Sequence, residues 1–299
     1  MADDAYTVDI GGRAVRLTNL ARVMYPAVGM TKADVVDYYR RVAPALLGQL
    51  RDRPVTRIRF PEGVAGEPFF EKNVPSGAPD WLRRLHLPAS PGEDPVGTVV
   101  EYPLIDDLAG LVWAANQNAL ELHTPQWRVT TDGSPRNPDR LVIDLDPGPP
   151  AGLAECAQVA LIVAERLAAD GLATVPVTSG GKGLHLYATL DGSVDAGAVR
   201  EYVHAIADEL AQSHPHAIVA GMRKELRRGR VLLDWSQNHP AKTTITPYSL
   251  RGRDRPTVAA PRTWDEIRPG TLAQLTADEV VARYERDGDP LADDAGRAL

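Results

Sequence analysis

Cysteine is almost absent from this chain of 299 residues. The single cysteine, Cys156, excludes an internal disulfide framework and is typical of a reducing compartment, and its Ala-rich surroundings predict a place in the core. Apolar runs long enough to span a membrane are also missing. The N-terminal stretch MADDAYTVDIGG is acidic and has no apolar segment, so we expect no signal peptide. Together these absences predict a cytoplasmic protein.

Basic residues are the minority among the charges: 33 Lys and Arg stand against 40 Asp and Glu, a formal net charge of −7. The sum argues against a nucleic-acid partner, but the distribution of charge matters more. Acid gathers toward the C-terminal end, and base gathers in the blocks RDRPVTRIR (51–59), MRKELRRGR (222–230) and SLRGRDR (249–255). These blocks fit a basic groove on an acidic protein and a merely solvated surface equally well.

What remains is ordinary globular composition, with 43% hydrophobic residues to build a sizeable core. Periodicity predicts helices over 31–50, 110–123, 152–171 and 196–213 and in LTADEVVARYERDG near the C-terminus, the first capped by Thr31 with Asp34. Strands are expected at RPVTRIRF and FFEK and over 141–146, 174–179, 183–190 and 230–236, with a small hairpin at 6–16. The Pro-, Gly- and Ser-rich residues 83–101 are expected to form a long surface loop. The mixture predicts an α+β or α/β fold.

The segment LVIDLDPG, residues 141–148, has the pattern of a buried strand that ends in two aspartates. Residues i and i+2 of a strand point to the same face, so Asp144 and Asp146 are predicted to be co-facial and roughly 7 Å apart. Unpaired carboxylates this close raise each other's pKa unless a cation neutralises them. Mg²⁺ and Mn²⁺ prefer carboxylate oxygens and would serve. Two surface acids on a solvated strand face are the alternative.

A third acid strengthens the metal interpretation. RVLLDWSQN (230–238) has the same form, an apolar strand followed by Asp234. If the two strands are neighbours, three carboxylates meet, which is the usual ligand set of a two-metal phosphoryl-transfer site. Read alone, Asp234 is equally well an acid that ends a strand.

The segment VTSGGKGLHLY, 177–187, resembles a phosphate cradle. Its small residues let backbone N–H groups approach an anion, and Lys182 adds positive charge. It is not a Walker motif, because GxxxxGK[ST] is absent and a strand, not a helix, follows. A plain glycine hairpin is the alternative.

Other candidate residues have two interpretations each. Arg251 and Arg253 would face one way in an extended chain and suit phosphate contacts, or they lie on a solvated edge strand. Phe69 or Phe70 could stack on a nucleobase, while one of the pair is expected in the core. His123, at the end of NALELH, is taken on sequence alone as a core histidine.

In this order, DLDP, SGGKGLH, VLLDWSQN and KTTITPYSLRGR resemble the polymerase domain of bacterial ligase D, a member of the archaeo-eukaryotic primase superfamily. The resemblance runs from about residue 15 toward residue 288. It implies a primase-like fold, in which an RNA-recognition-like sheet joins a second α/β layer. It also implies one catalytic domain, 1–299, with a DNA-binding part about 1–130, a catalytic sheet about 131–260 and a helical tail about 261–299.

The resemblance also implies roles for individual residues. Catalytic metal ligands would be Asp144, Asp146 and Asp234. The incoming nucleotide would be held by His123, Ser179, Lys182, His185, Gln237, Arg251 and Arg253. DNA would be contacted by Asn19, Arg22 and Lys32 at a 5′-phosphate, by Phe69 and Phe70 at the templating base, and by Arg227 in a loop near the active site. The loop 83–101 would help to pair DNA ends.

Two positions depart from the family pattern. Arg22 stands where a lysine is expected in the 5′-phosphate pocket, which keeps the charge and changes the geometry. Ile58 stands where a lysine is often found near the nucleotide, which affects nucleotide affinity or ribose preference.

The implied activity is a primase-polymerase that extends 3′ ends and fills gaps at DNA breaks by two-metal nucleotidyl transfer. NTPs, preferred to dNTPs, would be the substrates, Mn²⁺ or Mg²⁺ the cofactor, and the nucleoid the location. No ligase KxDG motif and no His-rich phosphoesterase segment occurs, so ligase and Ku are expected on separate polypeptides. The alternatives are a non-catalytic module that binds a 5′-phosphorylated DNA end, a two-metal nuclease, which would not need Lys182 with Arg251 and Arg253, and a primer-independent primase.

Overall fold

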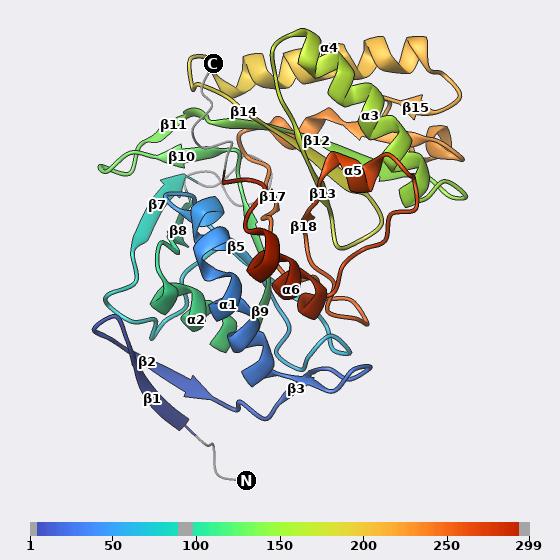
Figure 1. The fold of residues 1–299 in the computed structure, drawn as a ribbon. Helices are drawn as coiled ribbons and strands as arrows, with labels where there is room; N and C mark the ends of the chain where they lie inside the picture. The colour runs from blue at the N-terminus through green and yellow to red at the C-terminus, as the bar shows by residue number, and fades with distance from the viewer. Residues whose placement is uncertain (1–4, 89–97, 293–299) are drawn as a thin grey trace.

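A computed structural model describes residues 5–88 and 98–292 of the chain. Two mixed layers of helices and strands make up the fold, one built around a six-stranded sheet and the other around a four-stranded sheet (Figure 1). Within the described ranges, no helix is long and apolar enough to cross a membrane. The predicted mixed α/β class is therefore observed.

The six-stranded sheet has the order β15-β16-β12-β14-β13-β18. Only the β15–β16 pair is parallel. Its strands are β12 (Arg140–Pro147), β13 (Val175–Thr178), β14 (Leu184–Thr189), β15 (Ile218–Val219), β16 (Val231–Asp234) and β18 (Ala260–Pro261). Helices α3 (Leu153–Ala169) and α4 (Ala196–Ser213) cover one face of this sheet, and the short α5 (Trp264–Ile267) lies beside α3 (Figure 1). The central strand is β12, which carries the two aspartates.

The four-stranded sheet has the order β17-β9-β5-β6 and is antiparallel. Its strands are β5 (Thr56–Arg59), β6 (Phe69–Glu71), β9 (Ala119–Thr124) and β17 (Thr244–Ile245). Helices α1 (Lys32–Leu50), α2 (Leu108–Asn116) and α6 (Ala277–Asp287) pack together in this layer (Figure 1). Strand β17 comes from the second half of the chain, so the two layers are tied together at the edge where β17 meets β9.

Smaller pairings and single turns complete the chain. The two-stranded pairs are β1 (Ala5–Ile10) with β2 (Arg13–Thr18), β3 (Val23–Tyr25) with β4 (Met30–Thr31), β7 (Arg84–Pro88) with β8 (Val99–Pro103), and β10 (Trp127–Val129) with β11 (Pro135–Pro138). Two 3₁₀ turns, η1 (Lys224–Arg227) and η2 (Trp235–Asn238), flank β16. The hairpin predicted at 6–16 is the β1–β2 pair.

The start of α1 shows why the helix begins where the sequence predicts. The Thr31 side chain accepts a hydrogen bond from the Asp34 amide, and the Asp34 carboxylate accepts one from the Thr31 amide at 2.7 Å. This capping box satisfies two backbone donors that the first turn leaves free. Apolar residues then recur on the buried face, from Val35 to Leu50.

Two segments differ from prediction. Residues 110–123 do not form one helix: α2 ends at Asn116, and β9 begins at Ala119. Asn118 between them has a positive φ of 60°, a conformation that ends a helix. Residues 83–101 are not wholly loop, because β7 and β8 pair across five residues each. Residues 89–97, the rest of that loop, lie outside the described residues.

Candidate active site

A cavity of about 440 Å³ lies between the two sheets and is the centre of the candidate site. It is lined from β12, β14 and β16 on one side and from β9 and β17 on the other. All ten residues predicted as catalytic or nucleotide-binding line it: His123, Asp144, Asp146, Ser179, Lys182, His185, Asp234, Gln237, Arg251 and Arg253. Side chains more than a hundred positions apart in the chain therefore meet at one place.

The three aspartates come together through strand pairing. Asp144 and Asp146 lie two residues apart on β12 and are both half-buried, as the period of a strand requires. β16 runs antiparallel beside β12 in the register that places Asp234 directly opposite Asp144. On the other side, β14 places His185 opposite Asp144, with its Nε2 atom 3.4 Å from Asp144 Oδ1. The predicted neighbourhood of the three acids is thus built by backbone register.

The electrostatics of the aspartates show an excess of negative charge. Burial raises the pKa of Asp146, and the charges of Asp144 and Asp234 raise it further. Arg227 and Lys182 lower it only in part. The pKa of Asp146 stays raised despite two nearby basic side chains. Further positive charge at this position would therefore stabilise the ionised carboxylate.

Each aspartate nevertheless has protein partners in this structure. Asp146 Oδ2 accepts from Arg227 Nη1 at 3.0 Å. Asp234 Oδ1 accepts from the backbone amide and the hydroxyl of Ser236 at 3.0 and 2.5 Å. Asp234 Oδ2 accepts from the side-chain Nε2 of Gln237 at 3.1 Å. As the side chains stand, no group of three or more His, Cys, Asp or Glu among the described residues is arranged to hold a metal ion. Their oxygens are the ligand type that Mg²⁺ and Mn²⁺ prefer, so the chemistry of the three side chains fits a divalent cation.

The Ser-Gly-Gly-Lys-Gly segment is a tight turn between β13 and β14. The Ser179 hydroxyl accepts from the Gly181 and Gly183 amides at 3.2 and 3.3 Å. Gly180 has φ +69°, and a Cβ on Gly183 would overlap the Leu145 carbonyl oxygen of β12. Gly183 is therefore required by the close approach of the turn to β12, and Gly180 by its positive φ. Lys182 at its tip is exposed and lines the cavity.

Arg251 and Arg253 line the wall of the cavity beside the glycine turn, where the Arg251 stem lies against Gly180. The segment is not extended, the form that the prediction assumed, because the Arg253 amide donates to the Arg251 carbonyl at 2.9 Å. The Arg251 carbonyl accepts from the Tyr25 hydroxyl at 2.9 Å, and its amide donates to the Thr257 carbonyl at 2.8 Å. A Cβ on Gly252 would overlap the Phe60 ring. Phe60, Tyr25 and Thr257 thus hold the backbone that presents the two arginines.

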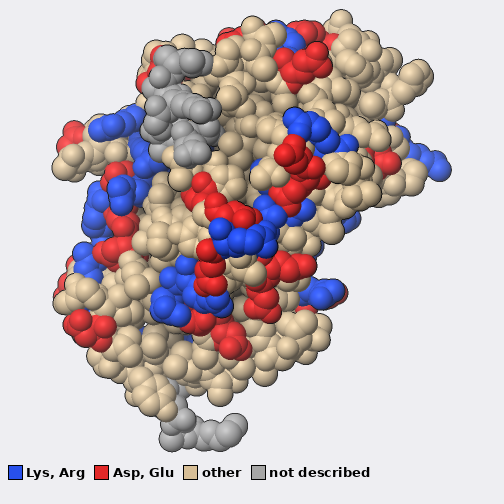
Figure 2. Space-filling model, in the orientation of Figure 1, with Lys and Arg blue, Asp and Glu red and all other residues tan. Residues whose placement is uncertain are grey.

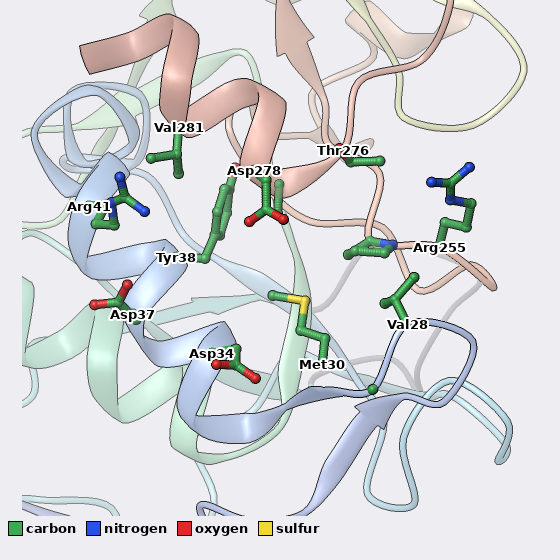
Figure 3. A pocket seen from close by; sticks show the side chains of 13 residues that line it. Val28, Met30, Asp34, Asp37, Tyr38, Arg41, Arg255, Thr276, Asp278 and Val281 are labelled. Atoms are coloured by element: carbon green, nitrogen blue, oxygen red, sulfur yellow. The ribbon is translucent and has the colours of Figure 1, made fainter.

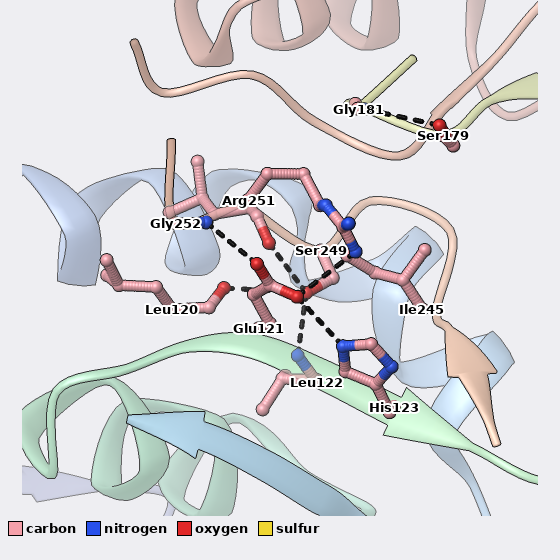
Figure 4. Close-up of polar contacts among 12 residues, drawn as sticks. Leu120, Glu121, Leu122, His123, Ser179, Gly181, Ile245, Ser249, Arg251 and Gly252 are labelled. Atoms are coloured by element: carbon pink, nitrogen blue, oxygen red, sulfur yellow. Dashed lines mark hydrogen bonds and ion pairs between the residues drawn. The ribbon is translucent and has the colours of Figure 1, made fainter. Parts of the chain in front are cut away.

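Sequence reasoning missed Glu121, which lies behind this wall (Figure 4). Its carboxylate accepts from His123 Nε2 at 2.9 Å, from Arg251 Nη1 at 3.1 Å and from the Gly252 amide at 3.0 Å. Burial alone would raise the pKa of Glu121, but these partners lower it below its ordinary value. Glu121 precedes His123 by two residues on β9, so the strand period was a signal that could have found it.

Two expectations about aromatic residues are wrong. His123, taken on sequence alone as a core histidine, is part of the cavity wall through its place on β9. Phe69 and Phe70 are 52% and 56% exposed, so neither lies in the core. They lie on β6, the edge strand of the four-stranded sheet, which among the described strands pairs only with β5.

The three residues predicted for a 5′-phosphate lie together at the start of α1. The Arg22 amide donates to the Asn19 carbonyl at 3.0 Å, and the Lys32 amide donates to the Arg22 carbonyl at 2.8 Å. Asn19 has φ 52°, and Lys32 is buried with its Nζ 2.9 Å from the Thr18 carbonyl oxygen. The Arg22 guanidinium donates to the Pro61 carbonyl. The set is a compact cluster, separate from the residues that line the cavity.

A second cavity, of about 350 Å³, lies between α1 and α6 and contains none of the predicted site residues (Figure 3). Of its acids, Asp34 caps α1 and Asp37 pairs with Arg40. Figure 2 shows acidic and basic side chains interleaved on the face over α1 and α6, where Arg41 pairs with Glu285 at 2.6 Å. This face has no continuous basic groove.

Comparison with known proteins identifies the family of the chain. Residues 31–291 match the family described as LigD, primase-polymerase domain. The chain belongs to this family. The LigD family membership confirms the resemblance and the polymerase class that the motifs predicted.

The LigD relatives include whole proteins and a solved domain. The chain is 49% identical over 282 residues to the multifunctional non-homologous end joining DNA repair protein LigD of Mycobacterium tuberculosis H37Rv, covering 93% of the chain and 36% of that protein. It is 32% identical over 281 residues to the bifunctional LigD of Bacillus subtilis 168, covering 93% and 44%. A solved polymerase domain of M. tuberculosis ligase D in complex with DNA superposes with a TM-score of 0.89 at 48% identity, covering 94% of this chain and 98% of that one. The chain thus spans 36% and 44% of the lengths of these two whole relatives.

Proposed function

We propose that this chain is a primase-polymerase that adds nucleotides to a DNA 3′ end at gaps and breaks. The observation that carries the proposal is the single cavity, where three strand-borne carboxylates face an exposed lysine and two arginines. Nucleotidyl transfer from a triphosphate requires carboxylates that hold divalent metal ions. It also requires basic side chains nearby that bind the phosphates. Ribonucleotides are the proposed preference.

Asp144, Asp146 and Asp234 would hold the divalent ions, Mn²⁺ or Mg²⁺. When bound, the ions would activate the attacking hydroxyl and neutralise charge on the triphosphate. Lys182 would meet the triphosphate as a point charge, and Arg251 with Arg253 as planar forks. Ser179 would act through the turn, because its hydroxyl already accepts from two amides there. His123, His185 and Gln237 line the remaining wall around the nucleotide.

The DNA would contact residues outside the cavity. Asn19, Arg22 and Lys32 would bind a downstream 5′-phosphate, and Phe69 with Phe70 would stack on the templating base, since both rings are exposed. Arg227 would release Asp146 when cations and DNA bind. Ku and a ligase on other polypeptides are the proposed partners, and the nucleoid is the proposed place of action. The division into parts 1–130, 131–260 and 261–299 stays a prediction.

The alternatives have weaker support. A two-metal nuclease would need the carboxylates and not Lys182, Arg251 and Arg253. A DNA-end-binding module would need the cluster around Lys32 and not the acids. Ile58, on β5 opposite Glu121, leaves the nucleotide side without the lysine common in the family, so the preference for ribose has to be measured.

The testing experiment is extension of a 5′-phosphorylated gapped duplex with Mn²⁺, comparing NTPs with dNTPs. Wild type should extend the primer, and Asp144→Asn should lose extension by more than about a hundredfold while still binding the gapped DNA. Asp208→Asn, an exposed acid on α4, is the matched control and should extend normally. Shortened primers would favour the nuclease, and phosphate-dependent binding without extension would favour the end-binding module.

A further inference from the structure

Glu121 is a buried carboxylate behind the cavity, with its side chain 8% exposed. It is not among the residues that line the cavity, yet both of its side-chain partners, His123 and Arg251, are. Its other oxygen holds the amide of Gly252, between the two arginines. One carboxylate therefore connects β9 to the segment that carries Arg251 and Arg253 (Figure 4).

We infer that Glu121 is a positioning residue, which holds His123 and Arg251 in the arrangement that binds the nucleotide. The inference rests on the proposed function, because it assumes that the cavity binds a nucleoside triphosphate. Glu121 acts through its two partners and does not itself touch the substrate.

For His123, the carboxylate fixes the proton. An ionised carboxylate only accepts hydrogen bonds, and the lowered pKa of Glu121 keeps it ionised at neutral pH. His123 Nε2 must therefore carry a proton, and in the neutral ring Nδ1 is left as an acceptor. Phosphate oxygens are also acceptors and cannot donate a hydrogen bond to Nδ1. The neutral His123 ring is therefore matched to a hydroxyl group that donates, on the sugar or at the primer end.

For Arg251, the carboxylate fixes direction. Burial lowers the pKa of Arg251, and Glu121 opposes that effect as an anionic partner of the buried guanidinium. The Arg251 stem also packs closely against Gly180 of the glycine turn, where a Cβ would come within 2.5 Å of Arg251 Cγ. With the stem confined and one nitrogen bound by Glu121, few rotamers remain for the guanidinium.

Glu71 provides a matched comparison for a purely structural role. It lies on β6 of the same sheet, its side chain is 13% exposed, and it pairs with Arg57 at 2.9 Å and Arg59 at 3.1 Å. Neither arginine lines the cavity. Loss of either carboxylate leaves a buried arginine without its anion, so both should lower the melting temperature.

The first experiment compares Glu121→Gln with Glu71→Gln. Nucleotide affinity is measured without DNA by titration of a fluorescent ATP analogue in Mn²⁺, and extension kinetics are measured on gapped DNA. Glu121→Gln should weaken affinity and raise the nucleotide KM about tenfold or more, with a smaller change in kcat. Glu71→Gln should leave both unchanged despite its lower melting temperature. The ¹⁵N shifts of His123 should show an Nε2-protonated ring in wild type and an altered one in Glu121→Gln.

A double-mutant cycle shows whether Glu121 acts through Arg251. In the Arg251→Ala background, Glu121→Gln should weaken affinity by clearly less than tenfold, because part of the coupling is already lost. The inference would be overturned by an unchanged KM in Glu121→Gln or by an equal KM effect in Glu71→Gln. It would also be overturned if the effects of Glu121→Gln and Arg251→Ala on affinity were fully additive, or if the wild type bound no nucleotide. Wild type that binds nucleotide and extends no DNA would overturn the polymerase proposal alone.

Discussion

Carboxylates in this protein differ by what surrounds each one. Asp146 has two acids beside it and a raised pKa, whereas Glu121 has a histidine, an arginine and an amide and a lowered pKa. The first environment favours added cations, and the second fixes the hydrogen-bond donors already present. Among the basic residues, Lys32 is likewise held by its surroundings. It is buried, and its ammonium donates to the Thr18 carbonyl oxygen, so the position of its charge is fixed.

Lys32→Ala tests the proposed 5′-phosphate cluster at the scale of one residue. Binding of gapped DNA with a 5′-phosphate should weaken about tenfold or more, and binding of the 5′-hydroxyl duplex should change little, because the phosphate contact is the only proposed contact of Lys32 with DNA. Fluorescence anisotropy on the two duplexes measures the difference. Arg40→Ala, an exposed residue on the same helix, is the control. Equal weakening on both duplexes would mean that Lys32 only supports the fold.

At the scale of elements, the glycine turn between β13 and β14 depends on backbone contact. Gly183→Ala should destabilise the protein by about 3 kcal/mol or more, since its Cβ would overlap the Leu145 carbonyl oxygen and neither backbone can move freely. Gly181→Ala should keep stability, because its nearest neighbour would be Ser179 Oγ at 3.4 Å. Urea denaturation of both variants measures this. Similar stability in the two would show that the turn shifts more easily than its packing implies.

Elements with a single dominant pattern could be predicted, and ambiguous ones could not. α1 has a capping box and one apolar face, and β12 is a short apolar run that ends with Asp144 and Asp146 on either side of Leu145. Residues 110–123 have an apolar pattern that suits a helix as well as a strand, and only pairing of β9 with β5 and β17 decides. β7 and β8 were hidden by a Pro- and Gly-rich composition that is typical of loops.

The site residues divide in the same way, into those with a local sequence pattern and those placed by pairing of distant strands. The strand period places Asp144 beside Asp146, while the meeting of Asp234 with them depends on the register of β16, which no local pattern contains. Glu121 was missed because residues 110–123 were predicted as one helix, which hides the strand period that places Glu121 beside His123 on β9. His123 and the exposed Phe69 and Phe70 were misjudged because burial depends on which surface the sheet leaves open.

On the whole-molecule scale, a cluster around Asp139 joins the two halves. Its carboxylate accepts from Arg53 Nη2 at 2.6 and 2.7 Å and from Arg128 Nε at 2.6 Å. Arg53 lies between α1 and β5, and Asp139 directly precedes β12 of the other sheet. Burial would raise the pKa of Asp139, but Arg53, Arg140 and Arg128 lower it below its ordinary value. The cluster therefore stabilises the contact between the layers while Asp139 is ionised.

Asp139→Asn should lower the free energy of unfolding at pH 7 by on the order of 2 kcal/mol, less than for a fully buried pair because Asp139 is one-third exposed. Since its folded pKa is depressed, Asp139 gives its full stabilisation above the ordinary value of 3.8, and that stabilisation is lost as pH falls toward the lower folded pKa. Wild type should therefore lose stability more steeply than the variant below about pH 4. Urea denaturation from pH 7 to pH 3 measures both slopes.

Asp37→Asn is the control, because Asp37 forms an exposed pair with Arg40. This variant should follow the wild-type curve within about 0.5 kcal/mol. Parallel curves for Asp139→Asn and wild type would mean that the arginines find other anions and that Asp139 does not join the two halves.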